Sequence, residues 1–154
     1  MQVTQTVTLS SGKLTATLTV HNTDSKPFDF TSSFHTYFSV KSLPEVSVEG
    51  LSGLKMLDRM QKPAAEGVCK EAVAIKGAVD SVYYNAPSEL TLKVGGGAKV
   101  GIKSKGWPDA VVWNPWTDMA ACYQEFVCVE NAAVAKPVVV APGASWSASM
   151  ELTA

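Results

Sequence analysis

Alternation of apolar and polar residues runs through most of this chain and restricts it to a fold built from half-buried β-strands. Between Leu14 and His21, apolar side chains alternate with threonines and the histidine. A period of two places the apolar side chains on one face of an extended strand and the polar ones on the other. Strands are therefore expected near the N-terminus and over residues 14–21, 28–40, 45–49, 73–76, 79–84, 89–94, 98–103, 111–113, 126–130, 138–141 and 145–152.

Turn signals separate these segments, whereas helical signals are weak. The cluster from Asn22 to Pro27 predicts a turn, and Gly95–Gly97 predicts a hairpin because glycine adopts positive φ without a steric penalty. Only residues 51–60 and 117–123 have a pattern compatible with short helices. Many short strands with turns between them are typical of an antiparallel sandwich or barrel. We therefore expect an all-β fold of antiparallel sheets.

Composition excludes several classes of function. The chain has 154 residues, which matches one domain, and its 13 basic and 14 acidic residues give a net charge of −1. This balance argues against a nucleic-acid-binding surface and against a polybasic membrane patch. No apolar run is long enough for a membrane span. The three cysteines and two histidines lack the spacing of metal ligands, so we expect buried free thiols and no metal site.

Two ionisable side chains, His35 and Glu130, are candidates for proton transfer. His35 is expected in mid-strand, on the polar face that also carries Tyr37 and opposite the phenylalanines. Histidine exchanges a proton near neutral pH, but a histidine on a strand can equally be structural. Glu130 follows an apolar segment, where it is either a partly buried base or a strand-end residue that points into water. The residues alone leave both alternatives open.

Two further groups of residues suit a polar ligand with an apolar face. Asp80 and Asp109 each precede an apolar segment, where an aspartate either binds a ligand or begins a strand, and a turn role is favoured for Asp109. Trp107, Trp113 and Trp116 lie within ten residues of one another. Aromatic rings suit the faces of sugars, but tryptophans are more often part of a core.

Three stretches resemble the hexose-6-phosphate 1-epimerases, which are relatives of aldose 1-epimerase (galactose mutarotase). They are FDFTSSFHTYFSV, VDSVYYNAP and WPDAVVWNPWTDMAACYQEFVCVENA, and the turn PGASW follows them in the family's order. Residues 116–123 are similar to the plant and cyanobacterial branch, the apospory-associated protein C group. The resemblance spans essentially the whole chain. It implies an antiparallel β-supersandwich and interconversion of the α and β anomers of an aldohexose 6-phosphate, with glucose 6-phosphate as the expected sugar and no metal or organic cofactor.

The resemblance also implies roles for individual residues. His35 falls on the family's histidine that protonates the ring oxygen, and Glu130 on the carboxylate that takes the proton from the C1 hydroxyl. Asp80 falls on an aspartate that holds sugar hydroxyls. Tyr37, on the face of His35, and Trp107, from the tryptophan cluster, are expected as further substrate contacts. A positioned acid and base open a hemiacetal without a free charged intermediate.

The resemblance covers only the C-terminal half of the proteins in this family. Residues 1–154 are therefore expected to form the C-terminal part of one domain. The family's H-G-F-x-R segment and the arginines expected to hold the phosphate have no counterpart in this chain. Half a sandwich would expose apolar faces and open strand edges. We therefore expect a second protein chain, or self-association, to cover the missing half.

Two other functions compete with a complete epimerase. The chain is alternatively a catalytically inactive, truncated relative that serves as a structural subunit, or a carbohydrate-binding module. Neither a nucleic acid nor a membrane is expected as a partner. The first ten residues contain no visible targeting segment, and the expected location is intracellular, in the cytoplasm or a plastid.

Overall fold

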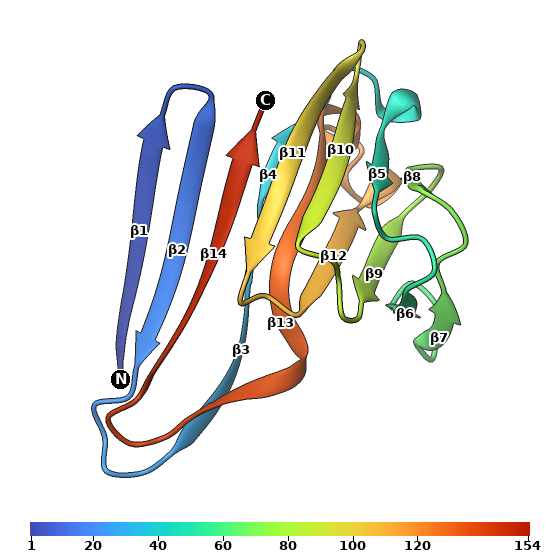
Figure 1. Ribbon diagram of the computed structural model, residues 1–154. Helices are drawn as coiled ribbons and strands as arrows, with labels where there is room; N and C mark the ends of the chain where they lie inside the picture. The colour runs from blue at the N-terminus through green and yellow to red at the C-terminus, as the bar shows by residue number, and fades with distance from the viewer.

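A computed structural model describes residues 1–154 and contains fourteen strands in two antiparallel sheets (Figure 1). Sheet A has the strand order β1-β2-β14-β11-β10-β5-β8. Its strands are β1 (Gln2–Ser10), β2 (Lys13–His21), β14 (Ser145–Thr153), β11 (Ala98–Lys105), β10 (Glu89–Gly95), β5 (Ser47–Glu49) and β8 (Val73–Ala74). The expected all-β, antiparallel architecture is confirmed.

Sheet B has the order β3-β13-β12-β9-β6-β7, and β4 also pairs with β13. Its strands are β3 (Phe28–Phe34), β13 (Phe126–Val140), β12 (Asp109–Asn114), β9 (Val79–Tyr83), β6 (Lys55–Asp58), β7 (Ala65–Val68) and β4 (Tyr37–Ser39). Three short 3₁₀ turns complete the chain: η1 (Leu43–Glu45), η2 (Trp116–Met119) and η3 (Tyr123–Glu125). No helix is long or apolar enough to span a membrane.

Several expected boundaries are wrong. The helix expected over residues 51–60 is replaced by β6, which pairs with β7 and β9, and residues 117–123 form only 3₁₀ and turn structure. The strand expected over residues 28–40 is broken at His35 and Thr36, where the Thr36 N–H turns back to the Phe34 carbonyl (2.9 Å). Conversely, β13 joins two segments that were expected to be separate, with a register shift between Ala133 and Val138.

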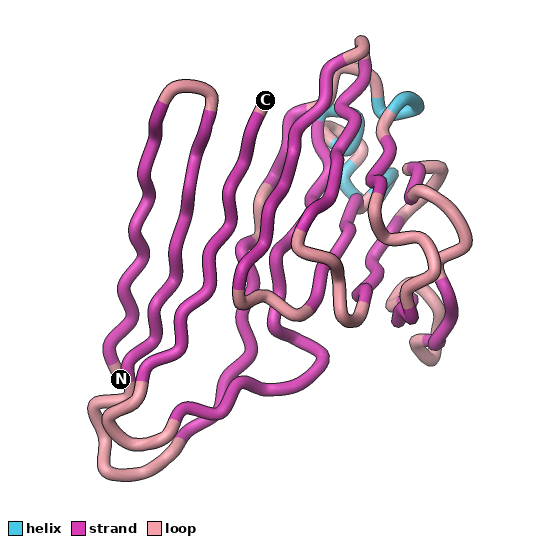
Figure 2. Tube along the Cα trace, viewed as in Figure 1, coloured by secondary structure: helices cyan, strands magenta, loops and turns pink.

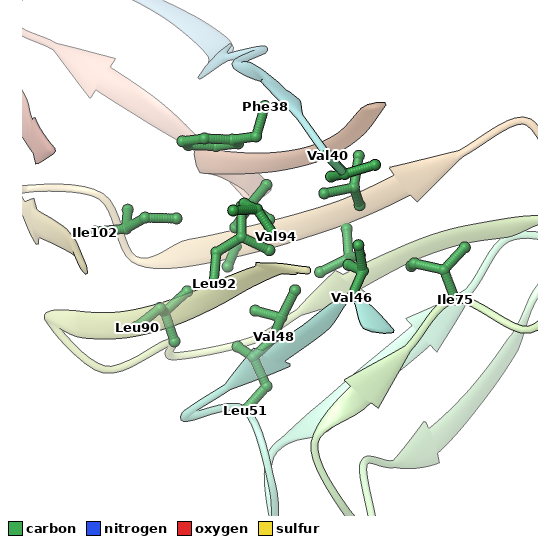
Figure 3. Close-up of a cluster of buried hydrophobic side chains, with 14 of the residues drawn as sticks. Phe38, Val40, Val46, Val48, Leu51, Ile75, Leu90, Leu92, Val94 and Ile102 are labelled. Atoms are coloured by element: carbon green, nitrogen blue, oxygen red, sulfur yellow. The ribbon is translucent and has the colours of Figure 1, made fainter. Parts of the chain in front are cut away.

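The hydrophobic core lies between the two sheets and consists of inward-facing residues of both. Leu92 of β10 and Val112 of β12, one from each sheet, are completely buried. Figure 3 shows Phe38 of β4 above Leu92 and Val94 of β10, with Val46 and Val48 continuing the cluster. Full burial of each such side chain contributes about 1.5–3 kcal/mol, so this layer is a main source of the attraction between the two sheets.

Sheet A extends beyond sheet B on the side of the hairpin β1–β2. Figures 1 and 2 show this hairpin standing to one side of the sandwich, and β1 pairs only with β2. Its apolar residues continue the inner face of sheet A, yet Val3, Val7 and Leu9 are 54%, 58% and 79% exposed. The segment Gln2–Ser10 contains no charged residue and no proline, which commonly protect edge strands.

Candidate active site

His35, Glu130 and Ser33 meet on the outer face of sheet B. His35 Nε2 lies 3.3 Å from Glu130 Oε1, and Ser33 Oγ donates a hydrogen bond to Glu130 Oε2 (2.7 Å). The Glu130 side chain is 7% exposed, whereas that of His35 is 46% exposed. Each carboxylate oxygen therefore has one polar partner, and the partner of Oε1 is accessible to solvent. The structure places the two residues expected to transfer protons in direct contact, and their roles remain predictions.

Strand register explains why residues so distant in sequence come together. On β13, Phe126, Cys128, Glu130 and Ala132 point away from the core, because successive side chains of a strand alternate between its faces. Tyr37 of β4 pairs with Cys128, and Ser33 of β3 pairs with Ala132. The short break between β3 and β4 therefore places His35 beside Glu130.

Aromatic rings surround the histidine. The Tyr37 ring stacks on His35 with centroids 4.9 Å apart and planes 19° apart, and Trp113 meets His35 edge-on at 5.6 Å. Phe126 contacts both Tyr37 and Trp113. These rings form an apolar surface beside a histidine–carboxylate pair, which suits a ligand that has both hydroxyl groups and a C–H face.

Two groups next to this pair stay neutral at physiological pH. Burial raises the pKa of the Cys128 thiol to about 12, and the negative charge of Glu130 adds to the effect. Desolvation also raises the pKa of the Tyr37 phenol, although its ring is largely exposed, and Cys128 and Glu130 contribute further. Cys128 is therefore a neutral, buried thiol without the thiolate character of a nucleophile, and Tyr37 is available as a hydrogen-bond donor.

Asp80 lies on the same outer face, beyond Trp113, which is its cross-strand partner. The only arginine of the chain, Arg59, donates to Asp80 Oδ1 from Nε (2.8 Å) and from Nη2 (2.5 Å). Both bonds use the same carboxylate oxygen, and the Asp80 side chain is 27% exposed. Asp80 therefore belongs to a fixed ion pair that keeps a second oxygen available for a ligand.

Trp107 does not lie at this site, and its predicted role as a substrate contact is corrected. Its side chain is buried, and its ring packs against Phe34 and Trp146 with centroid distances of 5.1 Å. The reason is its place in the connection from β11 of sheet A to β12 of sheet B, where the chain crosses between the sheets. The tryptophan that borders His35 is Trp113.

Sequence reasoning also missed Arg59 and Ser33 as parts of the site. Arg59 was hidden by the helix expected over residues 51–60. As a continuation of strand β6, Arg59 shares the outward face of Leu57. Ser33 shares the polar alternation of its strand with His35, so this signal was present in the sequence. No group of three or more histidine, cysteine, aspartate or glutamate side chains has the arrangement of a metal site.

Comparison with known proteins agrees with this fold. A protein of Cenchrus ciliaris, provisionally named a glucose-6-phosphate 1-epimerase, is 38% identical over 155 residues, which cover 94% of this chain and 47% of that protein. A crystal structure from Salmonella typhimurium, provisionally described as a mutarotase, superposes with a TM-score of 0.82 at 22% identity and covers 92% of this chain and 50% of the other. A Synechocystis sp. PCC 6803 structure gives a TM-score of 0.81 at 14% identity, over 98% and 53% of the two chains.

The chain thus spans about half the length of the relatives that it matches. The model of the family described as aldose 1-epimerase matches residues 1–153, nearly the whole chain. The fold of two antiparallel sheets and the outward-facing histidine–glutamate pair agree with this match. The chain belongs to the aldose 1-epimerase family.

Proposed function

We propose that this chain provides the acid and the base for interconverting the α and β anomers of an aldohexose 6-phosphate, with glucose 6-phosphate as the expected sugar. The observation that carries the proposal is the contact between His35 Nε2 and Glu130 Oε1 on an aromatic-lined sheet face. The relative from Cenchrus ciliaris, named for a glucose-6-phosphate activity, supports the choice of sugar.

Ring opening begins with His35 protonated and Glu130 ionised. Glu130 takes the proton from the C1 hydroxyl, the C1–O5 bond breaks as the C1 carbonyl forms, and His35 delivers its proton to O5. Rotation about the C1–C2 bond then presents the other carbonyl face, and the ring closes with the two roles exchanged. Both protons are returned, so each turnover leaves the pair as it began.

The local contacts suit these roles. Ser33 occupies Glu130 Oε2, which leaves Oε1 as the oxygen that faces the histidine and an incoming sugar. The His35 side chain is half exposed, and in this proposal it moves aside when the sugar enters between the two groups. The free oxygen of Asp80 is suited to a sugar hydroxyl, and Trp113 and Tyr37 to the C–H face of the ring.

A partner that completes the sandwich is part of the proposal. The exposed apolar residues of β1 and the unprotected strand edge favour association with a second protein chain or a second copy of this chain. Arg59 is engaged by Asp80, and no other arginine is available for a phosphate group. We therefore expect the substrate phosphate to be held mainly by residues of the completing chain.

The test is anomer exchange of glucose 6-phosphate, followed by NMR, with the chain alone and mixed with the N-terminal half of a close relative. The assembled pair should exceed the spontaneous rate. Glu130→Gln and His35→Asn should each lower it by roughly 10²–10⁴-fold, the usual effect of losing a positioned acid or base. The double variant should lose less than the two single losses combined, because the groups act as a unit.

Matched controls are available in the chain itself. Glu125→Gln changes an exposed carboxylate near the same strand, and His21→Asn changes the only other histidine. Both should keep the full rate. If the catalytic variants also keep the full rate, the assigned roles are wrong. If no assembled form exchanges anomers, a structural or carbohydrate-binding subunit becomes the better account of the chain.

A further inference from the structure

A separate cavity of about 590 Å³ lies at the end of the sandwich where β4 and β12 end and β13 begins. Its lining comes from the segments 41–44 and 75–76, from Trp116, and from residues 123–124. Neither His35 nor Glu130 contributes to it. Its floor includes Leu43 and Ile75, two buried core residues, so the cavity opens between the sheets rather than on the outer face of sheet B. Its volume falls within the range of small-molecule sites.

The charge of this lining is entirely positive. Lys41 and Lys76 line the cavity from separate segments, no carboxylate lines it, and neither lysine forms an ion pair. The nearby Glu45 does not line the cavity. It accepts a hydrogen bond from the Gly96 N–H (2.7 Å), and the Lys41 side chain lies over Gly96. A cavity of about 460 Å³ at the other end of β12 differs, because Glu66 and Asp109 balance its two lysines. An anion is therefore favoured at the first cavity and not at the second.

One wall of the cavity is aromatic, and the backbone of Trp116 in this wall is strained. The rings of Trp116 and Tyr123 pack with centroids 5.0 Å apart. Trp116 has φ = +52°, a region that residues with a side chain rarely adopt and that is enriched at functional sites. The side chain of Asn114, fully buried, accepts the Trp116 N–H (2.9 Å) and fixes this geometry.

We propose that this cavity binds a small phosphate ester. The phosphate group pairs with Lys41 and Lys76, with Ser42 and Gln124 available as additional donors. The remainder of the ligand packs on the rings of Trp116 and Tyr123. The site is distinct from the histidine–glutamate pair and does not depend on the proposed catalytic activity. Nucleotides and sugar phosphates share this chemistry, and the experiment distinguishes them.

The experiment measures binding of AMP, glucose 6-phosphate and inorganic phosphate to the Glu130→Gln chain, by calorimetry and by amide shifts in NMR spectra. This background removes a residue of the other site without touching the cavity. At least one ester should bind, with shifts at the segments 41–44, 75–76 and 116–124. Lys41→Gln and Lys76→Gln should each weaken it by about tenfold or more, as expected for a lost hydrogen bond to a charged group.

Further variants and ligands test which part of the ligand contacts the lysines and which part contacts the aromatic wall. Tyr123→Leu should weaken the ester much more than inorganic phosphate, because only the ester uses the aromatic wall. Lys26→Gln and Lys70→Gln, which change exposed lysines outside the cavity, should have no effect. AMP binding without glucose 6-phosphate binding identifies a nucleotide, and the reverse identifies a sugar phosphate. The proposal is overturned if no ester binds, if adenosine or glucose binds as tightly as its phosphate, or if the Lys41 and Lys76 variants bind normally.

Discussion

Asn22 and Asn114 are both fully buried, and each holds a loop through the same kind of hydrogen bonds. Comparing the two therefore tests whether Asn114 shapes the cavity beside Trp116 as well as stabilising the fold. Asn114 donates from Nδ2 to the carbonyls of Tyr123 (2.9 Å) and Phe126 (2.8 Å), and its Oδ1 accepts the Trp116 N–H. Asn22 donates to two carbonyls at 2.8 and 2.9 Å and accepts the N–H of the residue two positions later. The two side chains therefore make equivalent sets of three bonds.

We predict similar losses of stability for Asn22→Ala and Asn114→Ala. Each change removes three hydrogen bonds at a buried position, and a buried hydrogen bond contributes about 1 kcal/mol net, so the free energy of unfolding should fall by about 3 kcal/mol. For a chain of 154 residues this corresponds to a drop in Tm of roughly 6–12 °C. Urea unfolding with an unchanged m-value measures the loss directly.

The two variants should differ in their effect on the cavity beside Trp116. Asn114→Ala releases the strained Trp116 backbone and should weaken phosphate-ester binding at least tenfold, whereas Asn22→Ala should leave it unchanged, because Asn22 holds a loop next to β14 and not the cavity. Equal ligand affinity in both variants would refute the claim that Asn114 shapes the cavity. A loss below 1 kcal/mol in both would refute the hydrogen-bond estimate.

Two more predictions concern alkaline stability and the open sheet edge. Burial raises the pKa of Cys128 from 9.0, and that of Tyr83 from 10.0, to about 12 in each case, so above pH 9 the unfolded chain loses protons that the folded chain retains. These two groups should therefore not change the free energy of unfolding below pH 9. Cys128 should lower it between pH 9 and about 12, and Tyr83 between pH 10 and about 12, by at most about 1.4 kcal/mol per pH unit for each group. Cys128→Ala should reduce this slope in urea titrations under reducing conditions, and an identical slope would contradict the assignment. Val7→Lys, on the exposed apolar face of β1, should weaken association with the completing half or a second copy at least tenfold in sedimentation experiments, whereas Thr6→Lys on the opposite face should have little effect. A wild-type chain that stays monomeric with either partner would overturn the edge prediction.

The strands were predictable from sequence because alternation is a local signal. Residues 14–21, 89–94 and 145–152 are found within strands, close to the expected boundaries. The failures occurred where the pattern was too short to separate strand from helix, as in residues 51–60. The break at His35 could not be predicted, because the alternation of residues 28–40 continues through it while the backbone turns at Thr36.

The contents of the candidate site were partly predictable for the same reason. Alternation placed His35 and Tyr37 on one face, and the structure stacks their rings. It could not tell which tryptophan joins them, because Trp107 lies in a connection between sheets, where the period of two no longer applies. The Arg59–Asp80 pair depends on the pairing of β6 with β9, a long-range contact that no local pattern encodes.

Strand β13 links the stability of the fold to the geometry of the proposed acid–base pair. Residues 127–133 of this strand are buried on both faces, which is typical of a central strand, although the outer face of sheet B has no second sheet over it. The cover comes from surrounding side chains. Trp113, Tyr37 and His35 lie over one stretch, and at another Ala132 packs in a cluster with Val82 and Val111, against which Leu57, Tyr84 and Val134 also pack. Glu130 lies where these two apolar patches meet, so its carboxylate is removed from water without being enclosed.

A buried carboxylate needs partners, and Ser33 and His35 supply them. His35 is the exposed member of this set, so under the proposed function a sugar that displaces it would meet a carboxylate already positioned by the rest of the sheet, and proton transfer would need little reorganisation of Glu130.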